Sequence, residues 1–217
     1  MTATQKLFEL VAAEDAEGLA KAVPDADLAR LHNEGGESLY RFALFHGHAK
    51  CAEMLKRHGA LPFHDAALSG DASRVDELLA AAPWAIDLLS PDGWTALHLA
   101  AFFGNDAVVE VLLTRGASAR IMGRAFEQNL PIHAACAGRR IGRSAFAQLV
   151  AATGDPDAKQ KQGYTALMIA AGNGFAEAVD VLLEAGADPA IKQAEGKSAA
   201  DFARERGHAE IAARLAE

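Results

Sequence analysis

Residues 92–120 read Asp92-Gly-Trp-Thr-Ala-Leu-His-Leu-Ala-Ala-Phe-Phe-Gly-Asn-Asp-Ala-Val-Val-Glu-Val-Leu-Leu-Thr-Arg-Gly-Ala-Ser-Ala-Arg120, the clearest copy of a unit that recurs along the chain. Thr95 stands where a helix N-cap is expected, because its hydroxyl can accept a hydrogen bond from a free backbone N–H two or three residues later. Gly104 supplies the left-handed residue that ends a helix without a clash at Cβ. The stretch therefore predicts a short helix, a tight turn and a second, strongly apolar helix.

A single pair of such short helices cannot bury its apolar surface alone, so neighbours of the same kind are required. Gly93 recurs as Gly163 and Gly196, and Gln128 holds the equivalent place between Gly93 and Gly163. The spacings between these four positions are 35, 35 and 33 residues. This spacing fits the period of about 33 residues that is typical of a turn followed by two helices. The sequence therefore predicts a row of stacked repeats.

The run Gly93-Trp-Thr-Ala-Leu-His-Leu-Ala-Ala101 resembles the Gly-x-Thr-Pro-Leu-His-x-Ala-Ala signature of ankyrin repeats. Ala96 and Ala166 replace the proline of the signature, and Met168 replaces its histidine in a later copy. The resemblance implies an all-α solenoid of helix-turn-helix units with projecting β-turn or hairpin loops. We expect one domain over residues 1–217 with end repeats that act as caps, divided at approximately 3–35, 36–58, 59–92, 93–127, 128–162, 163–195 and 196–217.

Two irregularities interrupt the expected repeats. The third repeat starts at Gly59, only 23 residues after Gly36, so about ten residues are missing from the period. We therefore predict that the projecting turn between repeats two and three is absent and leaves a notch. In repeat five, two additional residues around Gly138–Arg143 predict a bulge at the junction of its helices.

Composition and charge limit the possible classes of protein. The chain has 217 residues, 51% of them hydrophobic and 23% charged, which is typical of a folded protein. Its net charge of −8 argues against a general affinity for nucleic acids or anionic membranes. No apolar run approaches the ~20 residues of a membrane span, and the first residues do not resemble a signal peptide. We expect a cytoplasmic monomer with free, buried thiols at Cys51 and Cys136.

Three histidines, His64, His98 and His133, hold equivalent places in consecutive repeats. A shared metal ion needs ligand atoms within roughly 3–4 Å of one another, whereas stacked helices are separated by about 8–10 Å. The family resemblance instead implies a structural role, in which the ring bonds to the turn near the helix start. The chain also lacks a Gly-x-Ser-x-Gly elbow and a Gly-rich phosphate loop. We therefore predict no metal, no cofactor and no catalysis.

Aromatic residues at positions expected to face the concave side are the candidate contacts for a partner. Exposed Trp and Tyr are enriched at the energetic centres of interfaces, and an apolar patch left in water usually has a partner. The alternative is that Phe102 or Phe103 packs under a neighbouring turn. The candidate contacts are Phe45, Trp94, Phe102, Phe103, Phe126 and Tyr164.

Five arginines give residues 120–143 a positive charge, although the chain as a whole is acidic. Glu127 is the only acidic residue between them. Guanidinium groups bind carboxylates and phosphates well, so an acidic segment of a partner could dock beside the aromatic residues. The alternative is a solvated face that keeps an irregular repeat soluble. These residues are Arg120, Arg124, Arg139, Arg140 and Arg143.

The resemblance to ankyrin repeats implies a non-catalytic protein–protein interaction module, such as a scaffold, an adaptor or an inhibitor. The sequence adds a preferred surface, which is the concave face of repeats three to six, with Trp94, Phe103 and Tyr164 as its main contacts. Two other classes stay open at this point. One is a binder of an anionic ligand or nucleic acid through the arginines, and the other, favoured least, is an enzyme.

Overall fold

The computed structural model describes residues 2–23, 31–58, 61–124 and 128–216. These residues form α-helices that follow one another as seven pairs, and one pair falls within each expected repeat. The first helices of the pairs are α1 (Ala3–Ala12), α3 (Leu39–Phe45), α5 (Phe63–Ser69), α7 (Ala96–Phe103), α9 (Pro131–Gly138), α11 (Ala166–Gly172) and α13 (Ala199–Glu205). The second helices are α2 (Ala16–Ala22), α4 (Ala49–Arg57), α6 (Ala72–Ala81), α8 (Asp106–Thr114), α10 (Arg143–Thr153), α12 (Ala176–Glu184) and α14 (Ala209–Arg214).

Short hydroxyl side chains fix where several of the first helices begin. The Thr95 hydroxyl accepts a hydrogen bond from the backbone N–H of His98 at 3.3 Å, and Thr165 does the same for Met168 at 3.3 Å. Each bond satisfies an N–H group that the helix itself leaves without a partner. Gly104 ends α7 with a left-handed backbone, at φ 73°. The helix starts and the end of α7 therefore follow the sequence signals.

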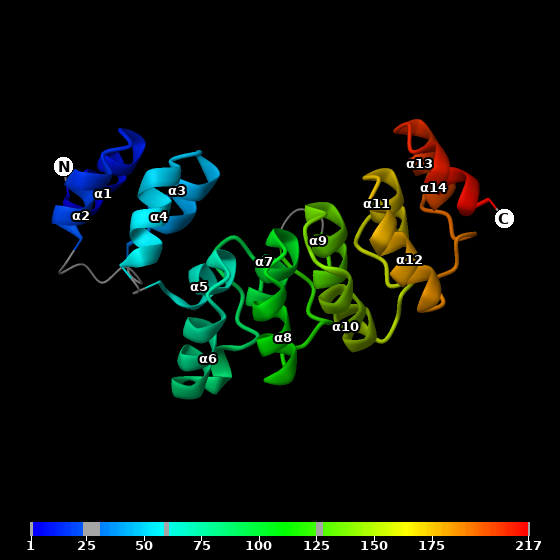
Figure 1. The fold of residues 1–217 in the computed structure, drawn as a ribbon, viewed down its shortest axis with the longest axis horizontal. Helices are drawn as coiled ribbons and strands as arrows, with labels where there is room; N and C mark the ends of the chain where they lie inside the picture. The colour runs from blue at the N-terminus through cyan, green and yellow to red at the C-terminus, as the bar shows by residue number, and fades with distance from the viewer. Residues whose placement is uncertain (1, 24–30, 59–60, 125–127, 217) are drawn as a thin grey trace.

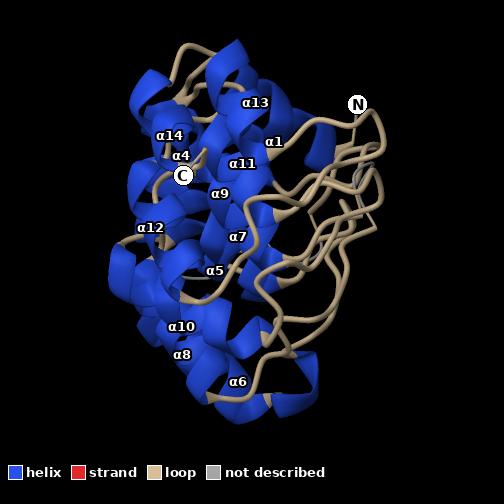
Figure 2. Ribbon diagram, turned by 90° about the vertical axis from the view of Figure 1, so that its right-hand side faces the viewer, coloured by secondary structure: helices blue, strands red, loops and turns tan. Residues whose placement is uncertain are grey.

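The helices form two parallel series along a curved row. The helices α5, α7, α9, α11 and α13 pack in sequence on the inner side of the curve, and α6, α8, α10 and α12 pack in sequence on its outer side (Figure 1). The connecting turns gather on one side of the row (Figure 2). Isolated antiparallel bridges such as Leu89 to Thr95 and Lys159 to Thr165 close some of these turns just before a first helix.

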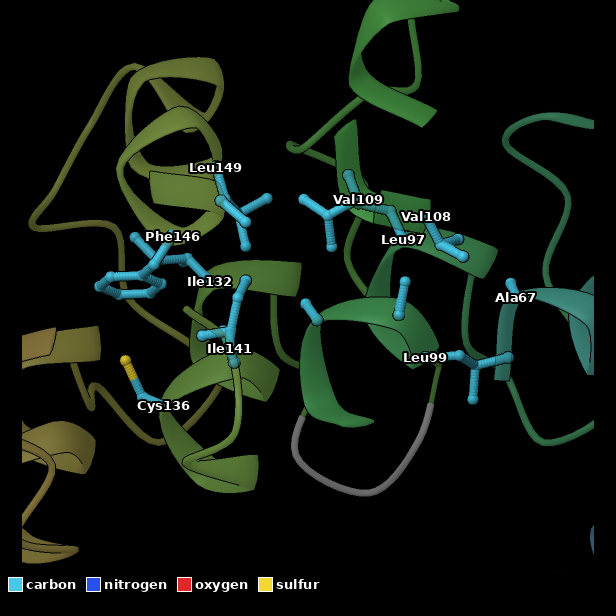
Figure 3. Close-up of a cluster of buried hydrophobic side chains, with 14 of the residues drawn as sticks. Ala67, Leu97, Leu99, Val108, Val109, Ile132, Cys136, Ile141, Phe146 and Leu149 are labelled. Carbon is cyan, nitrogen blue, oxygen red and sulfur yellow. The ribbon is translucent and has the colours of Figure 1, made fainter. Parts of the chain in front are cut away.

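The apolar core runs along the row between the two series. Val109 of α8 points toward Leu149 of α10, and Leu97 of α7, Ile132 of α9 and Phe146 of α10 belong to the same cluster (Figure 3). All five side chains are almost completely buried. Because each repeat completes the core of its neighbour, the repeats depend on one another for burial of their apolar surface.

The row is interrupted between repeats two and three. Only residues 58–62 join α4 to α5, whereas residues 115–130 join α8 to α9. These helix bounds agree with the missing turn expected from the repeat spacing, although Gly59 and Ala60 themselves lie outside the described residues. Within the part of the chain that the structure describes, α3 and α4 pack on α1 and α2, whereas their backbones come close to those of α5 and α6 at few places. The stack thus divides into an N-terminal block, α1–α4, and a C-terminal block, α5–α14 (Figure 1).

The junction inside repeat five is longer than its counterpart in repeat four. Residues 139–142 join α9 to α10, whereas residues 104–105 join α7 to α8. The predicted insertion of two residues is therefore confirmed. Arg139 takes the left-handed conformation at the end of α9, at φ 58°, where α7 uses a glycine. This junction becomes part of the site described below.

Both cysteines are free and buried, as predicted, with Cys51 on α4 and Cys136 on α9. Burial raises the pKa of each thiol, most strongly that of Cys136. The helices in the described ranges are too short and too polar for any of them to span a lipid bilayer.

Candidate functional site

Aromatic residues from both blocks meet beside the interruption in the stack. Phe45 lies at the last position of α3, Phe102 and Phe103 end α7, and Trp94 precedes the N-cap of α7. The side chain of Phe45 is 49% exposed, and the other three are partly buried. The interruption therefore brings α3 and α7 together at their C-terminal ends, although α5 lies between them in the chain.

The four rings form one continuous chain of contacts. The Phe45 and Phe103 rings stack with their centroids 6.1 Å apart, and Phe103 meets Phe102 edge to face at 5.1 Å. Phe102 in turn meets Trp94 edge to face at 5.5 Å. These separations are typical of favourable aromatic pairs. The rings therefore support one another and leave one face of the cluster open.

The open face is a groove with a volume of about 510 Å³. Leu99, which is buried, lies at its base, and Leu44 of α3 extends it toward the N-terminal block. Most of the lining is apolar, with one acidic and one basic side chain, as is common for binding sites of this size. We call this site the aromatic groove, lined by Leu44, Phe45, Asp92, Trp94, Leu99, Phe102, Phe103 and Arg140.

The longer junction of repeat five places Arg140 at the groove. A Cβ atom on Gly138 would overlap the carbonyl group of Phe102, and one on Gly104 would overlap the backbone of Arg140. Glycine at both positions allows the junction to lie directly against the end of α7. The Arg140 guanidinium consequently lies 6.0 Å from the Phe103 ring centroid, within cation–π range.

The acidic side chain of the groove is already paired. Asp92 accepts a hydrogen bond from the Arg41 guanidinium at 2.5 Å and another from the Ser90 hydroxyl. Burial alone would raise the pKa of Asp92, but the Ser90 hydrogen bond and the Arg41 charge together hold that pKa below its usual range. Asp92 is therefore ionised near neutral pH, and Arg41 offsets its charge.

Arg41 connects the two blocks. Its Nε atom donates to Asp65 of α5 at 2.9 Å, and both side chains are almost fully buried. Arg41 itself belongs to α3 of the N-terminal block, while Asp65 and Asp92 belong to the C-terminal block. Arg41 stands at the position that holds histidine in repeats three to five, and its pairing across the interruption was not predicted.

Tyr164 does not join the aromatic groove. Its ring lies 5.3 Å from that of Phe202 on α13, and both line a separate pocket of about 280 Å³ together with Arg206. The structure therefore divides the predicted contact residues between two places. Phe126 lies outside the described residues, so its predicted contribution stays a prediction.

The five arginines singled out from the sequence have different surroundings. Arg120 donates to the carbonyl oxygen of Thr153 at 2.8 Å, and Arg143 pairs with Glu184 at 2.6 Å. Arg139 and Arg124 are exposed, whereas Arg140 lines the groove. The structure therefore brings one of the five to the aromatic groove.

The three equivalent histidines, His64, His98 and His133, link each repeat to the next through a hydrogen bond. Their Nε2 atoms donate to backbone carbonyl oxygens of the following turn, His64 to Leu88 at 2.8 Å and His98 to Asn129 at 2.9 Å. His133 makes the same contact, to Ala158 at 3.0 Å. Burial lowers the pKa of His98 and of His133 to about 4, so both rings are neutral near pH 7. The structural role that the family resemblance implied is confirmed.

Sequence reasoning also passed over the aromatic side chain that is most exposed among the described residues. Trp84, in the short 3₁₀ helix Pro83–Ala85, is 74% exposed and lies outside the groove lining. No periodic signal marks it, because it lies between α6 and the following turn. Among the described residues, no group of three or more His, Cys, Asp and Glu side chains is arranged to hold a metal ion.

Paired helices, projecting turns and a shared core define a helical repeat protein. Comparison with known families agrees, since the family described as ankyrin repeats (3 copies) matches residues 63–159 and 132–217. The chain belongs to the ankyrin repeat family.

Among curated proteins, a stretch of 78 residues is 32% identical to the NAD-capped RNA hydrolase NUDT12 of Homo sapiens. This stretch covers 36% of the chain and 17% of the length of the hydrolase.

Proposed function

We propose that this protein is a non-catalytic, monomeric protein-interaction module of the cytoplasm, and that its partner binds in the aromatic groove. Ankyrin repeats in general support protein interaction. The observation that carries the finer proposal is the cluster of Phe45, Trp94, Phe102 and Phe103, which leaves apolar surface open beside the interruption in the stack. Large aromatic side chains at the centre of an apolar hollow are the usual energetic centres of protein interfaces.

The hydrolase activity in the name of the human relative is not carried over to this chain. The matching stretch covers only 17% of that protein, and an activity belongs to a site rather than to a fold. A scaffold, an adaptor or an inhibitor would each use a groove of this kind. The proposal therefore concerns the surface and the class of ligand, which is a protein segment.

Selection of binders from a random-peptide phage library tests the proposal. Phe45→Asp places a charge on the most exposed ring of the groove without removing a fully buried side chain. Peptides that bind the unmodified protein should lose at least roughly tenfold in affinity for Phe45→Asp, as expected when a central contact of an interface is removed. Trp84→Ala is the matched control, because it removes an aromatic side chain that is more exposed but lies outside the groove.

Circular dichroism and thermal unfolding of both variants establish that they fold. A set of selected peptides that bind Phe45→Asp as tightly as the unmodified protein would contradict the proposed site. Peptides that lose binding only in Trp84→Ala would assign the interaction to a different surface.

A further inference from the structure

The chemistry of the aromatic groove defines the kind of segment that fits it. We propose, on the basis of the proposed function, that the partner segment packs a bulky apolar side chain against the open face of the Phe45, Phe103 and Phe102 rings and places a carboxylate against Arg140. Asp or Glu one or two residues from the apolar anchor would supply this carboxylate. The inference rests on the charges at the groove and on the rigidity of the junction that carries Arg140.

The two charged side chains of the groove differ in their surroundings. Asp92 is paired with Arg41 and bonded to Ser90, so its charge is already offset within the protein. Arg140 is exposed, and no carboxylate within the described ranges forms an ion pair with it. Its contact in the structure is with the face of Phe103. The groove therefore offers a net positive charge in a protein whose overall charge is −8.

The backbone around Arg140 is fixed on both sides. Ile141 is 2% exposed and belongs to the core, and the N–H of Gly142 donates to the Asp106 carboxylate at 3.0 Å. On the other side, Arg139 closes α9 in the left-handed conformation, and its N–H donates to Ala135. The fixed backbone holds the base of the Arg140 side chain beside the groove, so only the side chain itself has to be ordered when a ligand binds.

Guanidinium and carboxylate groups match in charge and geometry, because the guanidinium can donate two parallel hydrogen bonds. An apolar segment without an acid would leave the Arg140 charge without a partner at the edge of a newly covered surface. A basic segment would bring like charges together. The groove therefore favours a segment with an apolar anchor and a nearby acid over both alternatives.

A double-mutant cycle tests this inference. A selected peptide that depends on Phe45 is synthesised in two forms, with the acid next to its anchor intact or replaced by the corresponding amide. Binding of both forms is measured by fluorescence anisotropy to the unmodified protein and to Arg140→Met, which keeps the aliphatic stem and removes the charge. Replacing the acid should weaken binding to the unmodified protein by about fivefold and should leave binding to Arg140→Met unchanged.

Arg139→Met is the matched control, since the neighbouring arginine is also exposed but does not line the groove. The fivefold loss should persist in this variant and should shrink at high salt, where ion pairs near the surface are screened. Thermal unfolding of Arg140→Met within a degree or so of the unmodified protein would exclude a purely structural effect.

The possible results separate the inference from the proposed function. Selected peptides that depend on Phe45 but carry no acid near the anchor, and that bind Arg140→Met equally well, would overturn the inference and leave the proposed function standing. Absence of any binder that depends on Phe45 would overturn both. Dimerisation of the protein alone that is lost in Phe45→Asp would assign the groove to a second copy of the chain and would also overturn the inference.

Discussion

Arg41 occupies in repeat two the place that histidine occupies in repeats three to five. A histidine reaches the turn of the following repeat, as His98 does, but the turn after repeat two is missing. The longer arginine side chain reaches past the gap to Asp65 and Asp92. The substitution and the missing turn therefore belong together, because only a long cation can make this connection.

Removing Arg41 should be strongly destabilising. Arg41→Met would leave the buried Asp65 carboxylate without its cation, and one oxygen of that carboxylate already has no hydrogen-bond partner among the described residues. Loss of one partner of a buried ion pair costs about 3–5 kcal/mol. Urea unfolding measures this loss, and the double variant Arg41→Met, Asp65→Asn should recover part of it. Equal destabilisation in the single and double variants would contradict an ion-pair origin.

The buried histidines make stability depend on pH. The pKa of His98 falls from 6.5 to about 4 on folding because burial disfavours the charged ring. Between these values the unfolded chain binds a proton that the folded chain does not, so stability falls as the pH drops from 6.5 to 4. The loss is on the order of 3 kcal/mol for one such histidine.

The histidine effect can be separated from that of the carboxylates, which also titrate in this range. Urea unfolding of the unmodified protein and of His98→Gln is followed between pH 7 and pH 4. The variant should start less stable and should lose less stability as the pH falls. Parallel pH profiles for the two proteins would argue against the buried neutral ring.

Among the elements, the junction between α9 and α10 links the core to the groove. Its two additional residues extend the chain over the end of α7, and Ile141 holds it there as part of the core. Gly104 makes this approach possible, because any side chain at that position would overlap the Arg140 backbone. Gly104 of repeat four thus determines where Arg140 of repeat five lies.

A matched pair of glycine substitutions tests this arrangement. Gly47 and Gly104 both have positive φ angles, of 81° and 73°, but a Cβ at Gly47 meets nothing within 4 Å. Gly47→Ala should cost about 1 kcal/mol from backbone strain alone. Gly104→Ala should cost about 1–3 kcal/mol more because of overlap with the junction. Thermal unfolding measures both, and equal costs would show that the junction does not depend on Gly104.

The sequence predicts the individual helices well but predicts contacts between residues far apart in the chain less well. Helix starts follow from residues such as Thr95, and the missing turn and the insertion follow from counting residues between repeats. These signals are local, because each is read from the residues or the length of a single repeat.

Two contacts depend on how α3 packs relative to α7 at the irregular junction between repeats two and three. They are the contact of Phe45 with Phe103 and that of Arg41 with Asp92. A repeat pattern specifies the packing of regular neighbours, so it gives no register across an irregular junction. For the same reason the sequence grouped Tyr164 with Trp94, although the structure places Tyr164 in a separate pocket.

At the scale of the whole molecule, the N-terminal and C-terminal blocks should differ in stability. Repeat stacks are stabilised by contacts between neighbours, and the backbones of α3 and α4 come close to those of α5 and α6 at few places in the described part of the chain. The N-terminal block has only two helix pairs, whereas the C-terminal block has five.

Hydrogen exchange measured by mass spectrometry should therefore show faster exchange of the amides in α1–α4 than in α7–α10. Such regional differences report local opening free energies. Arg41→Met should increase exchange in the N-terminal block and leave α9–α12 nearly unchanged. Uniform protection across both blocks would contradict the division.

The small number of backbone contacts between α3–α4 and α5–α6 in the described residues also has a mechanical consequence. Relative displacement of the two blocks is expected where neighbouring repeats share the fewest contacts, which is between α3 and α5. Because Phe45 belongs to one block and Phe103 to the other, such a displacement would change the width of the aromatic groove. A ligand that contacts both rings would therefore join the two blocks and stiffen the protein.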